Sequence, residues 1–207
     1  MTDSTVQKRK AVFLDRDGVI VEDVHYLHRP EDITLIDGAA ETIAALNRAR
    51  VPVVIVTNQS GIGRGYFTEA AYRETRAALA AMLAAHGAKV DAEYYCPDHP
   101  VEGLGAYKRE SNRRKPGPGM VFEAAADLGL DLLSSVLVGD KRSDLEAGRA
   151  AGCMTALVRT GKGKTAEKEI ADFPDSADAV FDTLADAREW IASVLYLQTE
   201  TDIGCLD

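Results

Sequence analysis

The chain has 207 residues, of which 46% are hydrophobic, and a formal net charge of −9. This length suits one α/β domain with a sizeable core, and the negative charge argues against a surface that binds nucleic acid. No apolar run reaches the ~20 residues of a membrane span, residues 1–10 lack the apolar segment of a secretory signal, and three widely spaced cysteines suit a reducing compartment. We therefore expect a cytoplasmic monomer without nucleic-acid or membrane partners.

Short apolar runs alternate with amphipathic stretches along the chain. We expect strands at residues 11–14, 51–56, 92–96, 134–140, 155–159 and 179–181, and helices at 38–50, 68–87, 120–128, 141–151 and 184–197. This alternation predicts an α/β fold: a doubly wound, Rossmann-like parallel sheet with helices on both faces, whose strand order the pattern does not give. We expect a single domain over residues 11–197, a flexible N-terminus at 1–10 and a disordered tail at 198–207.

The first predicted strand runs straight into Asp15, Arg16, Asp17 and Gly18. Gly18 permits the sharp turn that ends the strand, and ligands of open α/β sheets bind beyond the carboxyl ends of the strands. If this pair of acids stood alone, we would interpret it as a strand that simply ends in solvated acids. A site is favoured because three later segments lie at a strand end or in the loop before a helix: Thr57-Asn58-Gln59-Ser60, Arg114-Lys115-Pro116 and Gly139-Asp140-Lys141-Arg142-Ser143-Asp144.

These residue types fit the cleavage of a phosphate ester. That reaction needs a nucleophile, an acid for the leaving alkoxide and positive charge on the transferring phosphoryl group. Asp15 could form an aspartyl-phosphate, and Asp17 could protonate the leaving oxygen and then deprotonate the attacking water.

Metal and phosphoryl ligands are available at the same edge of the predicted sheet. Asp15 and Asp140 could hold Mg²⁺ in an all-oxygen site, and Asp144, one helical turn further on, suits a role in orienting the metal site. Thr57 and the Asn58 amide could bind phosphoryl oxygens, whose charge Lys115 would offset. We therefore predict a magnesium-dependent phosphomonoester hydrolase.

Two glycine-rich segments and one other class of protein offer alternatives. Residues 61–65 resemble a dinucleotide-binding loop, but the third glycine falls one residue early. Residues 161–165 resemble a Walker loop, but Val158 stands where the leading glycine belongs. A receiver-like signalling module also carries a phospho-accepting Asp on a parallel sheet. Asp17 argues against it, because a general base beside the nucleophile would speed loss of the phosphate.

With these motifs the sequence resembles the haloacid dehalogenase superfamily of phosphohydrolases, up to about residue 160. The resemblance implies that Asp15 is the nucleophile and Asp17 the general acid and base. It also implies Mg²⁺ held by Asp15, the Asp17 carbonyl and Asp140, with Thr57 and Lys115 steadying the phosphoryl group.

Spacing narrows this resemblance to members without a cap domain, because the elements predicted between Asp15, Thr57 and Lys115 fill both gaps. Specificity would then come from the loops at residues 21–30 and 97–114. Residues 57–68 resemble the capless phosphatases of heptose bisphosphate, which implies a small phosphorylated sugar as substrate and a role in lipopolysaccharide biosynthesis. Histidinol-phosphatases are the alternative. The resemblance implies a substrate-binding set made of Asp23, Val24, His25, Tyr26, Asn58, Gln59, Ser60, Arg114 and Lys141.

The loop at residues 97–114 departs from those relatives, which often hold a structural zinc there through a Cys-x-His and a Cys-x-Cys pair. Here the first pair reads Cys96-Pro97-Asp98 and the second Ser111-Asn112-Arg113. Cys96 and His99 remain as candidate ligands, but a tetrahedral site needs four. We therefore expect no structural zinc.

Overall fold

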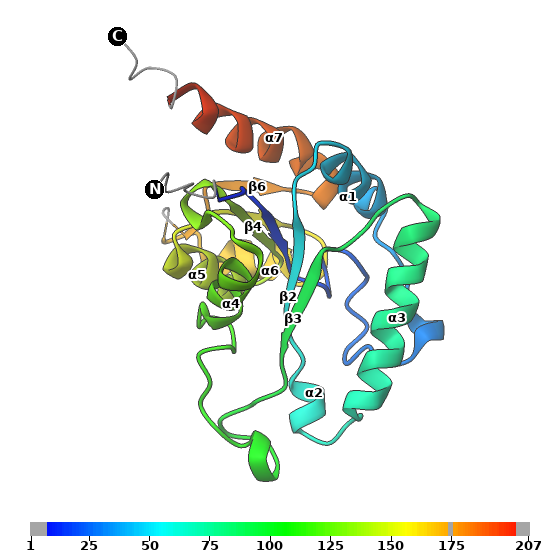
Figure 1. Cartoon of the computed structure of the whole chain (residues 1–207). Coiled ribbons are helices and arrows are strands. Elements are labelled where there is room, and N and C mark those ends of the chain that lie inside the picture. Colours follow the sequence, from blue (N-terminus) through cyan, green and yellow to red (C-terminus); the bar gives the residue numbers. More distant parts are fainter. Residues whose placement is uncertain (1–7, 174–175, 202–207) are drawn as a thin grey trace, which may run out of the picture.

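The computed structural model describes residues 8–173 and 176–201. Six parallel strands form one sheet in the order β3-β2-β1-β4-β5-β6 (Figure 1). The strands are β1 (Val12–Leu14), β2 (Val53–Asn58), β3 (Ala92–Cys96), β4 (Val136–Gly139), β5 (Met154–Val158) and β6 (Ala179–Phe181). The helices are α1 (Ala39–Arg48), α2 (Ser60–Gly63), α3 (Glu69–Ala85), α4 (Gly119–Leu128), α5 (Arg142–Ala151), α6 (Gly163–Glu169) and α7 (Leu184–Thr201), with 3-10 turns at Pro30–Asp32, Gly105–Tyr107 and Leu132–Ser134.

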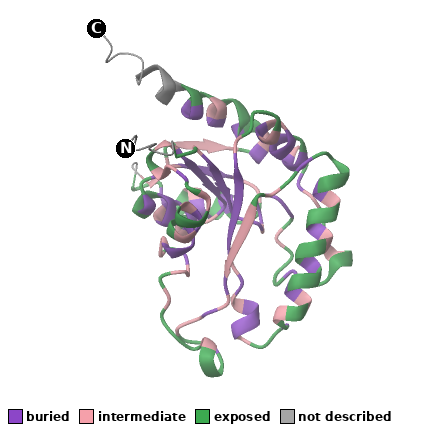
Figure 2. Cartoon of the chain, viewed as in Figure 1, coloured by how far each residue is buried: buried purple, intermediate pink, exposed green. Residues whose placement is uncertain are grey.

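Helices cover both faces of the sheet. Successive residues of a strand point to opposite faces, and the apolar side chains on each face pack against helices. Val12 and Leu14 of β1 pack with α1, α3 and α7, whereas Phe13 between them packs with α4. Figure 2 shows the central strands buried between helices whose outer sides are exposed, whereas the outer strands β3 and β6 are partly exposed. The predicted doubly wound sheet is confirmed. Between Asp15 and Lys115 the described chain holds only the helices and strands given above, without room for a cap.

The sequence patterns located most elements but missed two short helices. Neither α2 nor α6 was expected, because these helices contain glycines at residues 61, 63 and 163. Glycine indicates a turn when the tertiary contacts of a segment are not known. Thr68 caps α3 by accepting a hydrogen bond from the Ala71 amide (3.1 Å), and Gly87 follows its end with a φ of 70°. No helix in the described ranges is long and apolar enough to cross a membrane.

Contacts of residues 9 and 10 and the end of α7 describe the two ends of the domain. Arg9 pairs with Leu130, and Lys10 donates to the Leu195 carbonyl (2.5 Å), so the part of the predicted flexible N-terminus that is described is tied to the domain. At the other end α7 ends at Thr201, past the expected end of that helix at 197, and the disordered tail stays a prediction. Residues 1–7 and 202–207, where the rest of both predictions falls, lie outside the described residues.

Candidate active site

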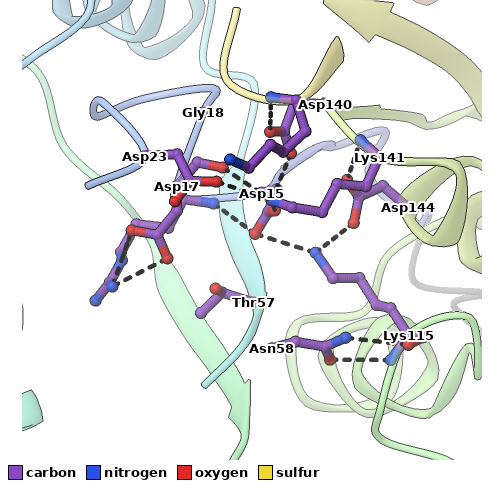
Figure 3. Close-up of polar contacts among 12 residues, drawn as sticks. Asp15, Asp17, Gly18, Asp23, Thr57, Asn58, Lys115, Asp140, Lys141 and Asp144 are labelled. Atoms are coloured by element: carbon purple, nitrogen blue, oxygen red, sulfur yellow. Dashed lines mark hydrogen bonds and ion pairs between the residues drawn. The ribbon is translucent and has the colours of Figure 1, made fainter. Parts of the chain in front are cut away.

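The carboxyl ends of β1, β2 and β4 bring the predicted polar residues together (Figure 3). Asp15 directly follows β1, Thr57 lies near the end of β2, and Asp140 directly follows β4. Because β1 pairs with both β2 and β4, it places Asp15 at the centre of this edge. Lys115 reaches the same point from the loop before α4.

Asp15 is a buried carboxylate surrounded by cations. Its Oδ1 accepts the Arg16 amide (2.8 Å) and lies 3.0 Å from Nζ of Lys115, while Oδ2 lies 3.7 Å from Nζ of Lys141. Burial alone would raise the pKa of Asp15, but the two ammonium groups outweigh burial and hold that pKa below its ordinary value. The group predicted as the nucleophile is therefore ionised.

Lys115 is fixed at both ends of its side chain. Its ammonium contacts Asp144 (2.7 Å) and the Val56 carbonyl (2.8 Å) as well as Asp15. Its backbone is held by Asn58, whose carboxamide accepts from the Lys115 amide and donates to the Lys115 carbonyl, both at 3.0 Å. This pairing was not predicted: the sequence suggested a role only for the Asn58 amide, since residue types do not reveal which distant backbone a side chain contacts.

Asp15, Asp140 and Asp144 each offer a carboxylate oxygen within 4.8 Å of the others, the one such group of possible metal ligands in the described part of the chain. Burial and the Asp15 carboxylate raise the pKa of Asp140 to about 7. Buried acids this close repel one another unless a cation lies between them.

A cation does lie among the predicted magnesium ligands: the ammonium of Lys141. Nζ lies 2.9 Å from Oδ1 of Asp140, 3.5 Å from the Asp17 carbonyl and 3.7 Å from Oδ2 of Asp15. The carboxylates of Asp15 and Asp140 raise the pKa of Lys141, against the lowering effect of burial. Three hard oxygens that converge on one positive charge form a donor set suited to Mg²⁺.

The loop after β5 contacts Asp140 and the turn that contains Gly18. The sequence did not predict this contact. The Lys162 amide donates to Oδ2 of Asp140 (2.8 Å), and the Thr160 hydroxyl donates to the Gly18 carbonyl (2.6 Å). Gly18 has a φ of 89°, and a Cβ there would lie 2.2 Å from Oδ2 of Asp140. Only glycine fits, so the turn after β1 serves to admit the Asp140 carboxylate as well as to end the strand.

Asp17 and Thr57 lie beside the cluster and share one partner. The Gln59 carboxamide donates to Oδ2 of Asp17 and to Oγ1 of Thr57, both at 3.0 Å. Thr57 is 1% exposed. Asp17 is part of the wall of a surface pocket of about 220 Å³.

That pocket gathers most of the predicted substrate-binding residues, together with Gly61 and Lys162, which were not predicted. Its walls are formed by Asp17, Asp23, His25, Tyr26, Asn58, Gln59, Ser60, Gly61, Lys141 and Lys162. Val24 and Arg114 are not among them. Arg114 is instead half-buried and donates to the Asp98 carbonyl (3.2 Å), so its contact with substrate stays a prediction.

In the loop at residues 97–114, Asp98 and Arg113, two of the positions that the resemblance associates with zinc ligands, form ion pairs. Oδ2 of the buried Asp98 lies 3.0 Å from Nε of Arg109, and Arg113 pairs with Glu123 (2.5 Å) and donates to the Tyr95 carbonyl (2.9 Å). Burial raises the pKa of the Cys96 thiol, although hydrogen bonds with Asp98 and Ser111 oppose that effect. These contacts order the loop through charge pairs, and the expected absence of zinc stays a prediction.

Comparison with known families gives two matches that together span most of the chain. A profile described as haloacid dehalogenase-like hydrolase matches residues 12–99, and one described as HAD-hydrolase-like matches residues 112–187. The first match contains Asp15, Asp17 and Thr57, and the second contains Lys115, Asp140 and Asp144.

Curated relatives are similar over nearly their full length. A D-glycero-alpha-D-manno-heptose-1,7-bisphosphate 7-phosphatase of Burkholderia mallei is 45% identical over 73% of this chain and 80% of its own. A D-glycero-beta-D-manno-heptose-1,7-bisphosphate 7-phosphatase of Vibrio cholerae is 43% identical over 90% of this chain and 98% of its own.

Among solved structures, the fold resembles that of D,D-heptose 1,7-bisphosphate phosphatase from B. bronchiseptica, complexed with magnesium and phosphate. The TM-score is 0.79 at 34% identity, over 89% of this chain and 98% of that one.

Proposed function

The chain belongs to the haloacid dehalogenase-like hydrolases, within the family of the heptose-1,7-bisphosphate 7-phosphatases, and we propose that it removes the 7-phosphate of D-glycero-D-manno-heptose 1,7-bisphosphate. The observation that carries this proposal is the buried Asp15 carboxylate, which lies 3.0 Å from Nζ of Lys115 and two residues before Asp17, a residue of the pocket wall. The chain is a phosphatase, and its own side chains supply the nucleophile, the general acid and the phosphoryl ligands.

In the first step, an Asp15 oxygen attacks phosphorus and forms an aspartyl-phosphate, while Asp17 gives a proton to the departing sugar oxygen. In the second, Asp17 takes a proton from water, which attacks the aspartyl-phosphate and releases inorganic phosphate. Lys115 and Thr57 bind phosphoryl oxygens throughout, which stabilises the charge of both transition states.

Mg²⁺ is the cofactor that the oxygen cluster fits. Asp15, Asp140 and the Asp17 carbonyl would hold it, and Asp144 would orient Lys115 beside it. When bound, the ion neutralises charge on the phosphoryl group and brings it up to the nucleophile. The relative that was solved with magnesium and phosphate supports this choice.

The 7-phosphate would lie against Asp15, and the sugar would extend into the pocket formed by Asp23, His25 and Tyr26. The relatives differ in the anomer that they act on, α in one and β in another. A substrate panel tests the proposal: both anomers of the bisphosphate, histidinol phosphate and an aryl phosphate, each assayed with Mg²⁺ for phosphate release. The proposal requires a kcat/KM for one heptose anomer above that for histidinol phosphate, and the reverse order would contradict it.

Such an activity would place the protein in the cytoplasm, in the synthesis of the activated heptose used for lipopolysaccharide. The absence of a structural zinc is part of the same proposal. It is supported by the ion pairs of Asp98 and Arg113, and elemental analysis of the purified chain would test it.

A further inference from the structure

The side chains of Arg16 and Gln59 hold the Asp17 carboxylate from two sides. Arg16 has no assigned role in the reaction, and Gln59 is predicted above only to bind substrate. Nε and Nη2 of Arg16 lie 3.1 and 3.0 Å from Oδ1, and Nη2 also lies 3.0 Å from Oδ2. Gln59 donates to Oδ2 (3.0 Å) and accepts from Nη2 of Arg16 (3.3 Å). The three side chains therefore form a closed ring of hydrogen bonds at the edge of the pocket, where Figure 3 shows dashed contacts on the Asp17 carboxylate.

Arg16 is itself immobilised. Its side chain is 1% exposed, its Nη2 donates to the Leu27 carbonyl (3.3 Å), and its guanidinium carbon lies 5.5 Å from the centre of the Tyr72 ring. Tyr72 is fully buried on α3 and donates to Glu93 of β3, which also pairs with Arg76 (3.1 Å). A buried arginine backed by an aromatic ring and a second ion pair is a rigid support, unlike an exposed arginine that samples many rotamers.

We propose that Arg16 and Gln59 are positioning residues that hold Asp17 for proton transfer, an inference that rests on the proposed role of Asp17 as general acid. The ring fixes the plane of the carboxyl group, so that an oxygen faces the leaving group within hydrogen-bonding reach. When Asp17 gives its proton to the leaving alkoxide, a carboxylate forms directly against the Arg16 guanidinium. The positive charge of Arg16 stabilises the charge that develops there, and a bidentate pair suits a guanidinium better than an ammonium.

The dependence on leaving group tests this role. A sugar alkoxide needs a proton as the P–O bond breaks, whereas p-nitrophenolate leaves without one. The kcat/KM of each substrate covers only the steps up to that cleavage, so the shared second step does not enter. The variants are Asp17→Asn, Arg16→Met and Gln59→Met, with Arg149→Met as control. Arg149 also pairs with an aspartate, Asp178 (3.1 Å), but at the opposite edge of the sheet.

We expect Asp17→Asn to lower kcat/KM on the heptose bisphosphate by about 10²–10⁴, the usual contribution of a general acid. Arg16→Met should lower it by at least about tenfold more on the bisphosphate than on p-nitrophenyl phosphate, and Gln59→Met should show the same selectivity with a smaller loss. Arg149→Met should leave the ratio between the two substrates unchanged.

Equal losses on both substrates in Arg16→Met and Gln59→Met would overturn the proposal, because a general disturbance of the site does not discriminate between leaving groups. If circular dichroism shows that Arg16→Met is unfolded, Arg16→Lys takes its place, because a lysine keeps the charge but loses the bidentate contact with Asp17. Gln59→Met does not decide alone, since Gln59 also lines the pocket. A selective Asp17→Asn with unselective Arg16 and Gln59 variants refutes only the positioning role. An Asp17→Asn variant without selectivity would refute the proposed acid and this inference with it.

Discussion

Nζ of Lys115 lies 3.0 Å from Oδ1 of Asp15, which joins the loop before α4 to the central strand of the sheet. The same ammonium lies 2.7 Å from Asp144, so one buried cation compensates two buried carboxylates. Charges that have left water depend on such partners, and removal of one partner leaves the others uncompensated.

Lys115→Met should therefore destabilise the fold as well as abolish activity. Breaking a buried ion pair typically costs about 3–5 kcal/mol, and we expect a loss of that size in the free energy of unfolding. Urea denaturation of wild type and variant in the absence of Mg²⁺ measures it. A loss below about 1 kcal/mol would show that Asp15 and Asp144 do not depend on this cation.

Gly18→Ala should weaken Mg²⁺ binding, because its Cβ would lie 2.2 Å from Oδ2 of Asp140 and displace that carboxylate. A matched control is Gly87→Ala, which has a similarly positive φ of 70° but no atom within 4 Å of the added Cβ. Both variants pay the conformational cost of a left-handed alanine, roughly 1–2 kcal/mol. Titration calorimetry with Mg²⁺ should show a higher Kd only for Gly18→Ala. An unchanged Kd in both variants would contradict a magnesium site that includes Asp140.

Lys141→Met should change the affinities for metal and for substrate in opposite directions. The Lys141 ammonium lies among the oxygens that would hold Mg²⁺, so its removal takes away a competing positive charge and should lower the Kd for the ion. The same ammonium lies in the wall of the pocket, so the KM for an anionic substrate should rise. Calorimetry and steady-state kinetics measure the two effects separately. A higher Kd for Mg²⁺ in Lys141→Met would contradict this prediction and show that Lys141 supports metal binding.

Many residues of this site can be predicted from the sequence, and there is a physical reason why the other contacts cannot. Acids and hydroxyls that follow apolar runs can be placed together, because the carboxyl ends of parallel strands share one edge. Contacts that depend on tertiary packing cannot be placed that way. Asn58 pairs with the Lys115 backbone, and the Lys162 amide binds Asp140, only because particular loops fold over particular strands.

Strand order and the role of Arg16 illustrate the same limit. Alternating strands and helices fit several orders of strands, and the order observed, β3-β2-β1-β4-β5-β6, depends on contacts between distant segments. Arg16 lies between two acids, and the sequence pattern assigns it no role, because its contact with Tyr72 of α3 depends on tertiary packing.

Cys153 should resist alkylation in the folded protein. It is buried, and burial raises the pKa of its thiol to about 12, so the reactive thiolate is scarce at pH 8. Because this pKa is raised, the Cys153 thiol ionises readily above pH 9 only in the unfolded chain. Its contribution to the free energy of unfolding therefore falls as pH rises from about 9 toward 12. Iodoacetamide labelling, resolved by residue with mass spectrometry, should modify Cys153 in urea but not in buffer. Rapid labelling in buffer would contradict its burial.

The assignments of Asp15 as the nucleophile and of the 7-phosphate as the group removed are tested most directly by ³¹P NMR. The heptose 1,7-bisphosphate is incubated with Mg²⁺ and either the wild-type chain or Asp15→Asn. With the wild type, the 7-phosphate resonance should be replaced by that of inorganic phosphate while the 1-phosphate resonance remains. Asp15→Asn should leave both ester resonances intact, because an amide cannot form the aspartyl-phosphate. Turnover by Asp15→Asn at the wild-type rate would contradict the assignment of the nucleophile, and loss of the 1-phosphate would contradict the assignment of the substrate position.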